Sequence, residues 1–298
     1  MARIGFLTCA SLEKYDFSPD FPNLLRDDIL LKNELERRGH TVTPIVWDQV
    51  TPGELKADLV FIRTPWDYLQ KAEAFLQWLA AAEAAGTPLQ NPARLVRWNL
   101  SKTYLLELQK KGVATIPTLS LDGNAEDALK RAFQAFKTER VVVKPLVGAS
   151  AYRTALLTRG QVPEFLAGTF RQWKNDSRFL VQPFLQEVEI EGEWSLIFFG
   201  EDFSHSLRKT PAQGDFRVQE LYGGASRAEA APACAIEAAT KVFSLLPVPP
   251  FYMRLDGIVR ENVFLVMELE LFEPELFFRA DPASAGRCAD RVEAALAR

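Results

Sequence analysis

Histidine and cysteine are scarce in this sequence, and their scarcity excludes several familiar active sites. The 298 residues include two histidines, His40 and His205, and three cysteines, Cys9, Cys234 and Cys288. No Ser/His/Asp or Cys/His arrangement follows from these positions, and the cysteines have no metal-ligand spacing. We therefore expect reduced thiols in a cytosolic protein, and we assign no catalytic role to His205.

Long apolar runs, an excess of charge of one sign and the best-known nucleotide-binding motifs are also missing. No run approaches the length needed to cross a bilayer, and the N-terminus has no signal-peptide pattern. The 35 basic and 39 acidic residues give a formal net charge of −4 without a Lys/Arg run, which argues against a nucleic-acid or membrane partner. Neither GxxxxGK[ST] nor GxGxxG occurs, so neither a P-loop NTPase nor a dinucleotide enzyme is indicated.

The first third of the chain alternates strand and helix patterns. Strands are predicted at residues 3–7, 40–47 and 57–63, and the helices between and after them end at Gly39 and Gly86. This order predicts a parallel sheet with helices against it, and ligands of such sheets collect at the C-terminal ends of the strands. The segment "RTPWDY", which directly follows "DLVFI", is expected at that edge.

The rest of the chain predicts antiparallel pairing. Residues 117–183 read as a compact α+β unit, in a chain long enough for two or three such units. Strands at 193–200 and 203–209 form an expected antiparallel pair, and an Ala-rich helix follows at about 229–246. A closing hairpin has its turn at Glu261–Asn262.

The hairpin carries three carboxylates. Counted from its turn, residue 255 or 256 lies opposite 267 or 268, so Asp256 and Glu268 can be neighbours, and Glu270 is one step further on the same face, roughly 7 Å along the strand from Glu268. Such a group suits a hard divalent cation such as Mg²⁺. It also suits a solvent-facing acidic strand that discourages edge pairing, with Arg254 neutralising one acid. Spacing alone leaves both interpretations open.

Basic side chains offer a second set of candidates. Lys144 ends the strand "RVVVKP" before a turn of small residues, where it could bind phosphate or simply extend to solvent. Lys209 and Arg217 could form ion pairs with the acidic patch or hold phosphate and a substrate carboxylate.

The segment "FLVQPFLQEVE" could contact an adenine. Pro183 interrupts the strand, which predicts that backbone groups at Gln182 and Leu185 lack a ladder partner and are free to pair with the base. Glu189 could then accept from ribose hydroxyls. An ordinary bend in the strand is the alternative.

Taken in order along the chain, these features resemble the ATP-grasp superfamily. The features are a lysine before a helix, a lysine after "VVV", a small-residue loop, "QPFL" with a later Glu, and a final Asp with Glu-x-Glu. The likeness is to the branch with RimK-like ligases and glutathione synthetases. "IRTPWDY" and "GEWSLIFF…SHSLRKTP…GDFR" resemble a sub-branch that includes the cyclo-ligase of cycloserine biosynthesis.

The resemblance implies a fold of mixed α/β and α+β class. It comprises an N-terminal Rossmann-like (preATP-grasp) domain over 1–95 and an ATP-grasp domain over 96–298. The second domain contains a small α+β lid subdomain at about 115–183 and a C-terminal antiparallel-sheet subdomain. The implied activity is ATP-dependent ligation of a carboxylate to an amine or related nucleophile, on a small amino-acid-like or peptide substrate, through an acyl phosphate.

The resemblance also implies roles for individual residues. Lys102 and Lys144 would bind the ATP phosphates under a loop that contains Gly148 and Ser150. Gln182 and Leu185 would contact the adenine, and Glu189 would contact the ribose. Asp256, Glu268 and Glu270 would bind Mg²⁺, or Mn²⁺ in its place. Three residues would have catalytic roles. Arg254 would lie near the oxyanion, and Lys209 and Arg217 would face the γ-phosphate or the substrate. For substrate recognition we select Arg63, Asp67 and Tyr68, at the edge of the N-terminal sheet.

Two departures from the family pattern leave other functions open. The family loop G-A-S-G-x-G is "GASAYR" here, and the last metal position, often Asn, is Glu270. A nucleotide-binding module without turnover and a small-molecule kinase on the same scaffold are the alternatives. We expect small-molecule partners, and the sequence leaves homo-oligomer formation open.

Overall fold

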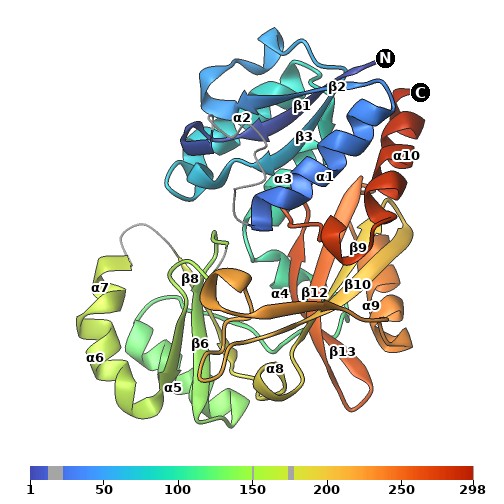
Figure 1. Cartoon of the computed structure of the whole chain (residues 1–298). Coiled ribbons are helices and arrows are strands. Elements are labelled where there is room, and N and C mark those ends of the chain that lie inside the picture. The colour runs from blue at the N-terminus through green and yellow to red at the C-terminus, as the bar shows by residue number, and fades with distance from the viewer. Residues whose placement is uncertain (13–22, 150, 174–177, 298) are drawn as a thin grey trace.

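The computed structural model describes residues 1–12, 23–149, 151–173 and 178–297. Its described part contains one parallel and two antiparallel sheets with helices packed against them (Figure 1). This confirms the predicted change from parallel to antiparallel pairing along the chain. Among the described residues, none of the helices has the length and apolar character needed to span a membrane.

The N-terminal sheet has the strand order β2-β1-β3-β4, and its strands are parallel. Helices cover both faces, so successive residues of the central strands are buried on opposite sides, as parallel sheets require. Phe61 packs toward α1 and α10, whereas Val60 and Ile62 pack toward α2. The elements are β1 (Arg3–Thr8), α1 (Asn23–Arg37), β2 (Thr41–Val46), β3 (Leu59–Thr64), α2 (Ala72–Ala84), β4 (Leu89–Gln90) and α3 (Ala93–Leu100).

The second sheet is small and antiparallel, with the order β5-β8-β6-β7. Strand alternation separates its two faces: Val141 and Val143 are buried against the helices, whereas Val142 and Lys144 lie on the other face. The elements are β5 (Leu119–Ser120), α5 (Ala125–Phe136), β6 (Arg140–Pro145), β7 (Ala155–Thr158), α6 (Val162–Ala167), α7 (Thr169–Trp173) and β8 (Phe179–Pro183).

The C-terminal sheet is antiparallel, with the order β11-β10-β9-β12-β13. The predicted Ala-rich helix is α9, and α10 returns to pack beside α1 of the N-terminal unit (Figure 1). The elements are α4 (Tyr104–Lys110), α8 (Glu187–Ile190), β9 (Glu193–Phe199), β10 (Asp202–Thr210), β11 (Ala225–Ala228), α9 (Ala233–Ser244), β12 (Tyr252–Arg260), β13 (Val263–Glu270) and α10 (Ser284–Leu296).

The closing hairpin has the predicted register. Glu261 and Asn262 have φ of 50° and 61°, as a tight two-residue hairpin turn requires. Asp256 is paired with Glu268 and Arg254 with Glu270, and a register shift follows between Asp256 and Gly257. The pairing places the three acids on one face of the hairpin.

This irregularity requires glycine at position 257, because the surrounding atoms leave no room for a side chain there. A Cβ there would lie 2.5 Å from the Leu265 carbonyl oxygen and 2.6 Å from the Phe264 ring. We expect Gly257→Ala to lower the free energy of unfolding by about 1–3 kcal/mol, since overpacking displaces the hairpin. Gly53→Ala, which meets no atom within 4 Å, is the matched control. Urea unfolding measures both, and equal midpoints would contradict the prediction.

Candidate active site

A cavity lies where the three sheets face one another. Its walls come from the end of β3 and the segment after it, from the open face of the second sheet, and from β9, β10, β12 and β13. The wall residues used below are Asp28, Arg63, Trp66, Lys102, Lys144, Gly148, Gln182, Leu185, Glu193, Lys209, Arg217, Arg254, Asp256, Glu268, Glu270, Glu273 and Glu275. The N-terminal sheet therefore contributes its C-terminal edge, as predicted.

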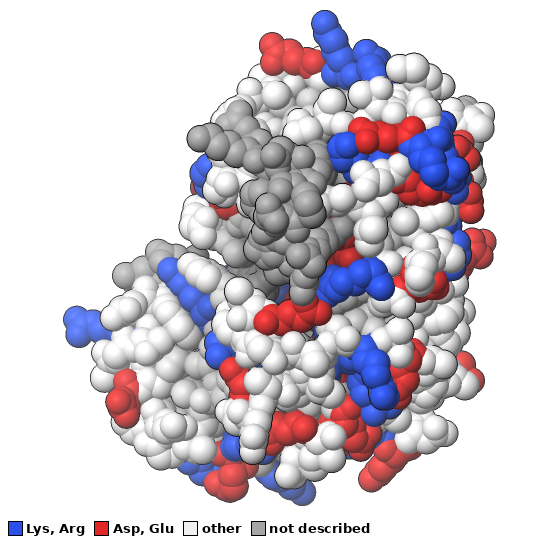
Figure 2. All heavy atoms as spheres, in the orientation of Figure 1, with Lys and Arg blue, Asp and Glu red and all other residues white. Residues whose placement is uncertain are grey.

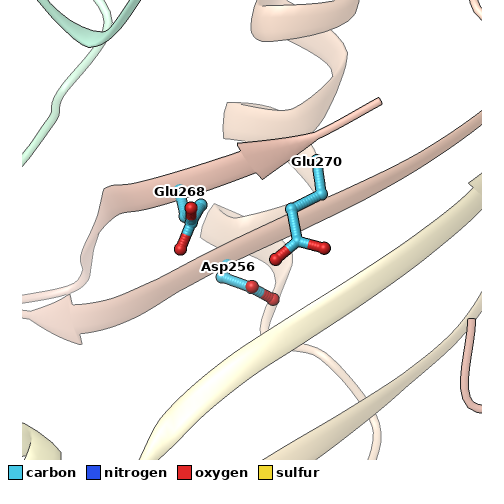
Figure 3. A group of neighbouring side chains, drawn as sticks. All are labelled: Asp256, Glu268 and Glu270. Atoms are coloured by element: carbon cyan, nitrogen blue, oxygen red, sulfur yellow. The ribbon is translucent and has the colours of Figure 1, made fainter. Parts of the chain in front are cut away.

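Three carboxylates gather on one wall. Asp256 projects from β12 and Glu268 and Glu270 from β13, toward one another, with one oxygen of each within 4.8 Å of the others (Figure 3). The Glu268 and Glu270 side chains remain 29% and 24% exposed, so the cluster is open on its cavity side. Closely grouped carboxylate oxygens are the ligands that Mg²⁺ prefers. The residues present therefore fit a hard divalent ion.

Protein cations neutralise the cluster in this structure. Arg254 donates to both oxygens of Asp256, at 2.9 to 3.1 Å, and also to Glu270. Lys102 donates to Glu268 at 2.5 Å. We expected a divalent ion or a single arginine to offset the repulsion along β13, but two cationic side chains share that task. An ion that binds here has to share Glu270 with Arg254.

Burial and these cations have opposite effects on the pKa values of the three acids: burial raises them, and the cations lower them. Desolvation raises the pKa of Glu270 to about 7, despite the charge of Arg254. For Asp256 burial also acts upward, but Arg254 and Lys209 outweigh it and lower the pKa. Lys102 and Lys144 likewise overcome desolvation and lower the pKa of Glu268. Two of the three ligands are thus ionised at neutral pH without an added ion.

Lys102 is held beside Glu268 by local contacts. Its backbone N–H donates to Leu146 at 2.8 Å, and its ammonium donates to the Gly148 carbonyl oxygen at 2.7 Å. The next turn begins α4, where the Tyr104 hydroxyl accepts from the Leu269 N–H of β13 at 3.0 Å. Lys102 therefore connects the loop after β6 to the acidic hairpin.

Lys144 lies across the cavity and is available to an anion. It donates a hydrogen bond to no residue that the structure describes, and desolvation lowers its pKa to about 8 despite the nearby charge of Glu268. A half-buried ammonium without a partner costs stability. The position suits a ligand with negative charge.

The loop after Lys144 keeps a glycine-like conformation without the glycines of the family pattern. Ala151 and Arg153, which stand where that pattern has Gly, have φ of 57° and 49°. A Cβ at Gly148 would come within 2.8 Å of Pro145, so this position requires glycine. Ser150, predicted to lie over the phosphates, falls outside the described residues.

The predicted adenine segment is only partly as expected. Gln182 lies in the β8–β6 ladder opposite Val142, so the prediction that its backbone lacks a ladder partner is wrong. Its side chain donates to Thr118 at 2.8 Å. Gln182 and Leu185 both line the cavity. Glu189 is not among the wall residues and accepts from Arg140 at 3.2 and 3.3 Å, so its ribose role stays a prediction.

Lys209 and Arg217 both line the cavity and both form ion pairs. Lys209 is buried between Glu193, to which it donates, and Asp256 at 3.6 Å. Arg217 pairs with Asp215 at 2.7 Å and lies 3.7 Å above the Tyr222 ring. The sequence could not choose between ion pairing and a site position, and the structure has both.

The three candidates for substrate recognition differ in position. Arg63 is 3% exposed, pairs with Asp28 at 2.8 Å and lines the cavity, and its Nη1 has no hydrogen-bond partner among the described residues. Asp67 is not a wall residue: it accepts from Trp47 and Lys71, each at 2.7 Å. The prediction that Asp67 faces the substrate is therefore not supported.

Tyr68 is not a wall residue. It is buried behind the wall, and its hydroxyl donates to Glu273, which lines the cavity. Sequence reasoning gave no role to several acidic cavity residues: Asp28, Glu193, Glu220, Glu273 and Glu275. Period-two alternation along β9, which pairs Ser195 with Asp256, could have indicated Glu193.

Comparison with known proteins identifies the class. The family "D-cycloserine synthetase DcsG, N-terminal domain" matches residues 4–91. Cycloserine biosynthesis protein DcsG of Streptomyces lavendulae is 30% identical over 250 residues, which cover 80% of this chain and 83% of that protein.

Solved structures agree in fold. A crystal structure of D-cycloserine synthetase DcsG is similar over 99% of both chains, with a TM-score of 0.83 and 24% identity. D-alanine–D-alanine ligase from Bacillus anthracis is similar over 100% of this chain and 98% of its own, with a TM-score of 0.70 and 16% identity. A RimK domain ATP-grasp protein from Sphaerobacter thermophilus reaches a TM-score of 0.69 at 17% identity, over 97% and 99% of the two chains.

The fold is that of an ATP-grasp ligase, as the sequence predicted. Within that class, the chain belongs to the family of cycloserine biosynthesis protein DcsG.

Lys144 gives a prediction that needs no ligand. Burial lowers its folded-state pKa from 10.5 to about 8, so its charge destabilises the protein below pH 8, and this penalty disappears as pH rises to 10.5. We expect Lys144→Met to raise the free energy of unfolding by about 1–3 kcal/mol at pH 7 and to lose that advantage near pH 10.5. Urea unfolding at both pH values tests this, with the exposed Lys110→Met as control. A Lys144→Met variant that is less stable than wild type at pH 7 would contradict it.

Proposed function

We propose that this ATP-grasp ligase uses ATP and Mg²⁺ to activate the carboxylate of a small amino-acid-like substrate as an acyl phosphate. A nitrogen nucleophile then takes the acyl group, and ADP and phosphate are the other products. The observation that carries the proposal is the convergence, in one cavity, of three grouped carboxylates with Lys102, Lys144, Lys209 and Arg254.

Known relatives support the cofactors. D-alanine–D-alanine ligase from Bacillus anthracis has been solved with ATP, and the ATP-grasp ligase PsnB with Mg and ADP. In this chain Asp256, Glu268 and Glu270 would hold Mg²⁺ or Mn²⁺, which when bound neutralises phosphate charge. Lys102 and the Lys144 ammonium, which has no partner among the described residues, would bind the phosphates.

Of the remaining wall residues, some would bind the nucleotide and others the substrate. Gln182 and Leu185 line the cavity on the second sheet's side, where an adenine would contact them, and the loop containing Gly148 would lie beside the phosphates. Arg63, whose Nη1 has no partner in the described part of the chain, lines the cavity from the N-terminal sheet and suits the substrate carboxylate.

Positioning and charge neutralisation provide most of the catalysis in such a reaction. The substrate carboxylate would attack the γ-phosphorus, and the Lys102 and Lys144 ammonium groups would stabilise the negative charge on the oxygens of the transferring phosphoryl group. In the second step Arg254, fixed by Asp256, would donate to the oxyanion that forms at the acyl carbon. No histidine or covalent nucleophile is required.

The surface agrees with small-molecule partners. Acidic and basic side chains are interspersed over the described part of the face in Figure 2, without an extended basic area there. We propose a cytoplasmic enzyme without a nucleic-acid or membrane partner, acting on small molecules.

The proposal predicts that the acidic hairpin is essential for turnover. We expect Asp256→Asn and Glu268→Gln to lower ADP formation by about 10²–10³-fold, because each removes a proposed metal ligand and the charge that pairs with Arg254 or Lys102. The assay measures ADP release with Mg²⁺ from free amino acids, D-alanine among them, short peptides, and ureido and hydroxy analogues. Glu126→Gln, on the exposed face of α5, is the matched control.

Three results would overturn the proposal. Wild-type rates in either hairpin variant would remove the metal assignment. A phosphorylated product would indicate a kinase. Tight ATP binding without ADP release from any acid would indicate a binding module.

A further inference from the structure

Glu273 differs from every other described carboxylate on the cavity wall, because it has no cationic partner. Asp256, Glu268 and Glu270 pair with Arg254 and Lys102. The remaining wall acids also have partners: Glu193 pairs with Lys209, Asp28 with Arg63, and both Glu220 and Glu275 with Arg279. Glu273 alone among these described residues is left for a ligand.

The two oxygens of Glu273 are used differently. One accepts from the hydroxyl of Tyr68, which is 2% exposed and packs against Phe75 and Phe272 at centroid distances of 5.6 and 5.3 Å. The other, Oε2, is buried and has no hydrogen-bond partner in the described part of the chain. Leaving a buried acceptor unpaired costs stability, so we expect Oε2 to have a partner during function.

The surroundings of Glu273 make its carboxylate a stronger base than that of an ordinary glutamate. Desolvation raises its pKa to about 8, and the Tyr68 hydrogen bond acts in the opposite direction. Glu270 and Glu268 of β13 oppose its ionisation, whereas Lys102 favours it. These groups place Glu273 beside the carboxylates and the lysine that we assign to phosphoryl transfer.

The second step of the proposed reaction needs a proton acceptor. When a nitrogen attacks the acyl carbon, its lone pair forms the C–N bond and the electron pair of the C–O bond leaves with phosphate. The nitrogen must then lose one proton, and the other wall carboxylates are engaged with cations. The unpaired carboxylate beside the reacting groups is the available acceptor.

We propose that Glu273 is the general base that takes this proton, through Oε2, and that Tyr68 is the residue that positions it. This inference rests on the proposed function and assigns its nucleophile as an N–H group. It also explains the segment Arg63–Tyr68, because Tyr68 connects the N-terminal sheet to the acidic wall without touching the cavity.

Hydroxylamine separates the two halves of the reaction. It is small and neutral at neutral pH, so it captures an acyl phosphate as a hydroxamate without a protein base. The acid and nucleophile that give the largest ADP release in the screen are incubated with Mg²⁺, ATP and hydroxylamine. The ratio of ligated product to hydroxamate then reports the second step alone.

We expect Glu273→Gln to form hydroxamate within about twofold of the wild-type rate and to lower the ratio by about 100-fold or more. Glu273→Asp retains a carboxylate and should recover part of the ratio. Tyr68→Phe should lower the ratio by about tenfold with hydroxamate unchanged. Glu34→Gln, which removes a carboxylate paired with Arg38 and is not a wall residue, is the matched control and should leave the ratio unchanged.

Two results would overturn the inference: a wild-type ratio in Glu273→Gln, or equal loss of hydroxamate and product. If Glu273→Gln does not fold, the ratio in Tyr68→Phe decides, and a wild-type value there overturns the inference. Failure of the proposed function looks different, because the wild-type protein itself would then form neither ADP nor hydroxamate with any acid.

Discussion

The ion pairing between the β12–β13 hairpin and its surrounding cations is the interaction on which the cavity depends. Three carboxylates on one face of the hairpin would repel one another, and burial would favour their protonated forms. Arg254 and Lys102 keep Asp256 and Glu268 ionised. The same contacts draw the loop after β6 toward the hairpin, since Lys102 also donates to Gly148. Charge balance and the shape of the cavity therefore have one origin.

The N-terminal unit completes the cavity through two kinds of contact. Arg63 reaches the cavity directly, but it is already neutralised by Asp28. Tyr68 acts indirectly by fixing a carboxylate that belongs to the C-terminal unit. The packing of α10 beside α1 holds these units together at the opposite end of the molecule (Figure 1). The cavity is thus built by elements more than 200 residues apart in the chain.

Sequence periodicity predicted the features that are local. The hairpin turn, the Asp256–Glu268 pairing and the position of Lys144 follow from alternation and from a two-residue turn. It could not predict which way a side chain turns where alternation ends. Trp66–Leu69 forms a 3-10 turn, which directs Asp67 toward Trp47. Glu273 was equally inaccessible to sequence reasoning, because its partner Tyr68 is distant in the chain.

The loop that begins at Gly148 has a further consequence for binding. Alanine and arginine occupy left-handed positions where glycine is the usual choice, at a steric cost of about 1–2 kcal/mol each. In return, a chain without those glycines samples fewer backbone conformations when it is not folded. Any ligand that orders this segment therefore removes less conformational entropy than it would from a glycine-rich loop. Its affinity is set more by contacts and less by the freedom that the backbone gives up.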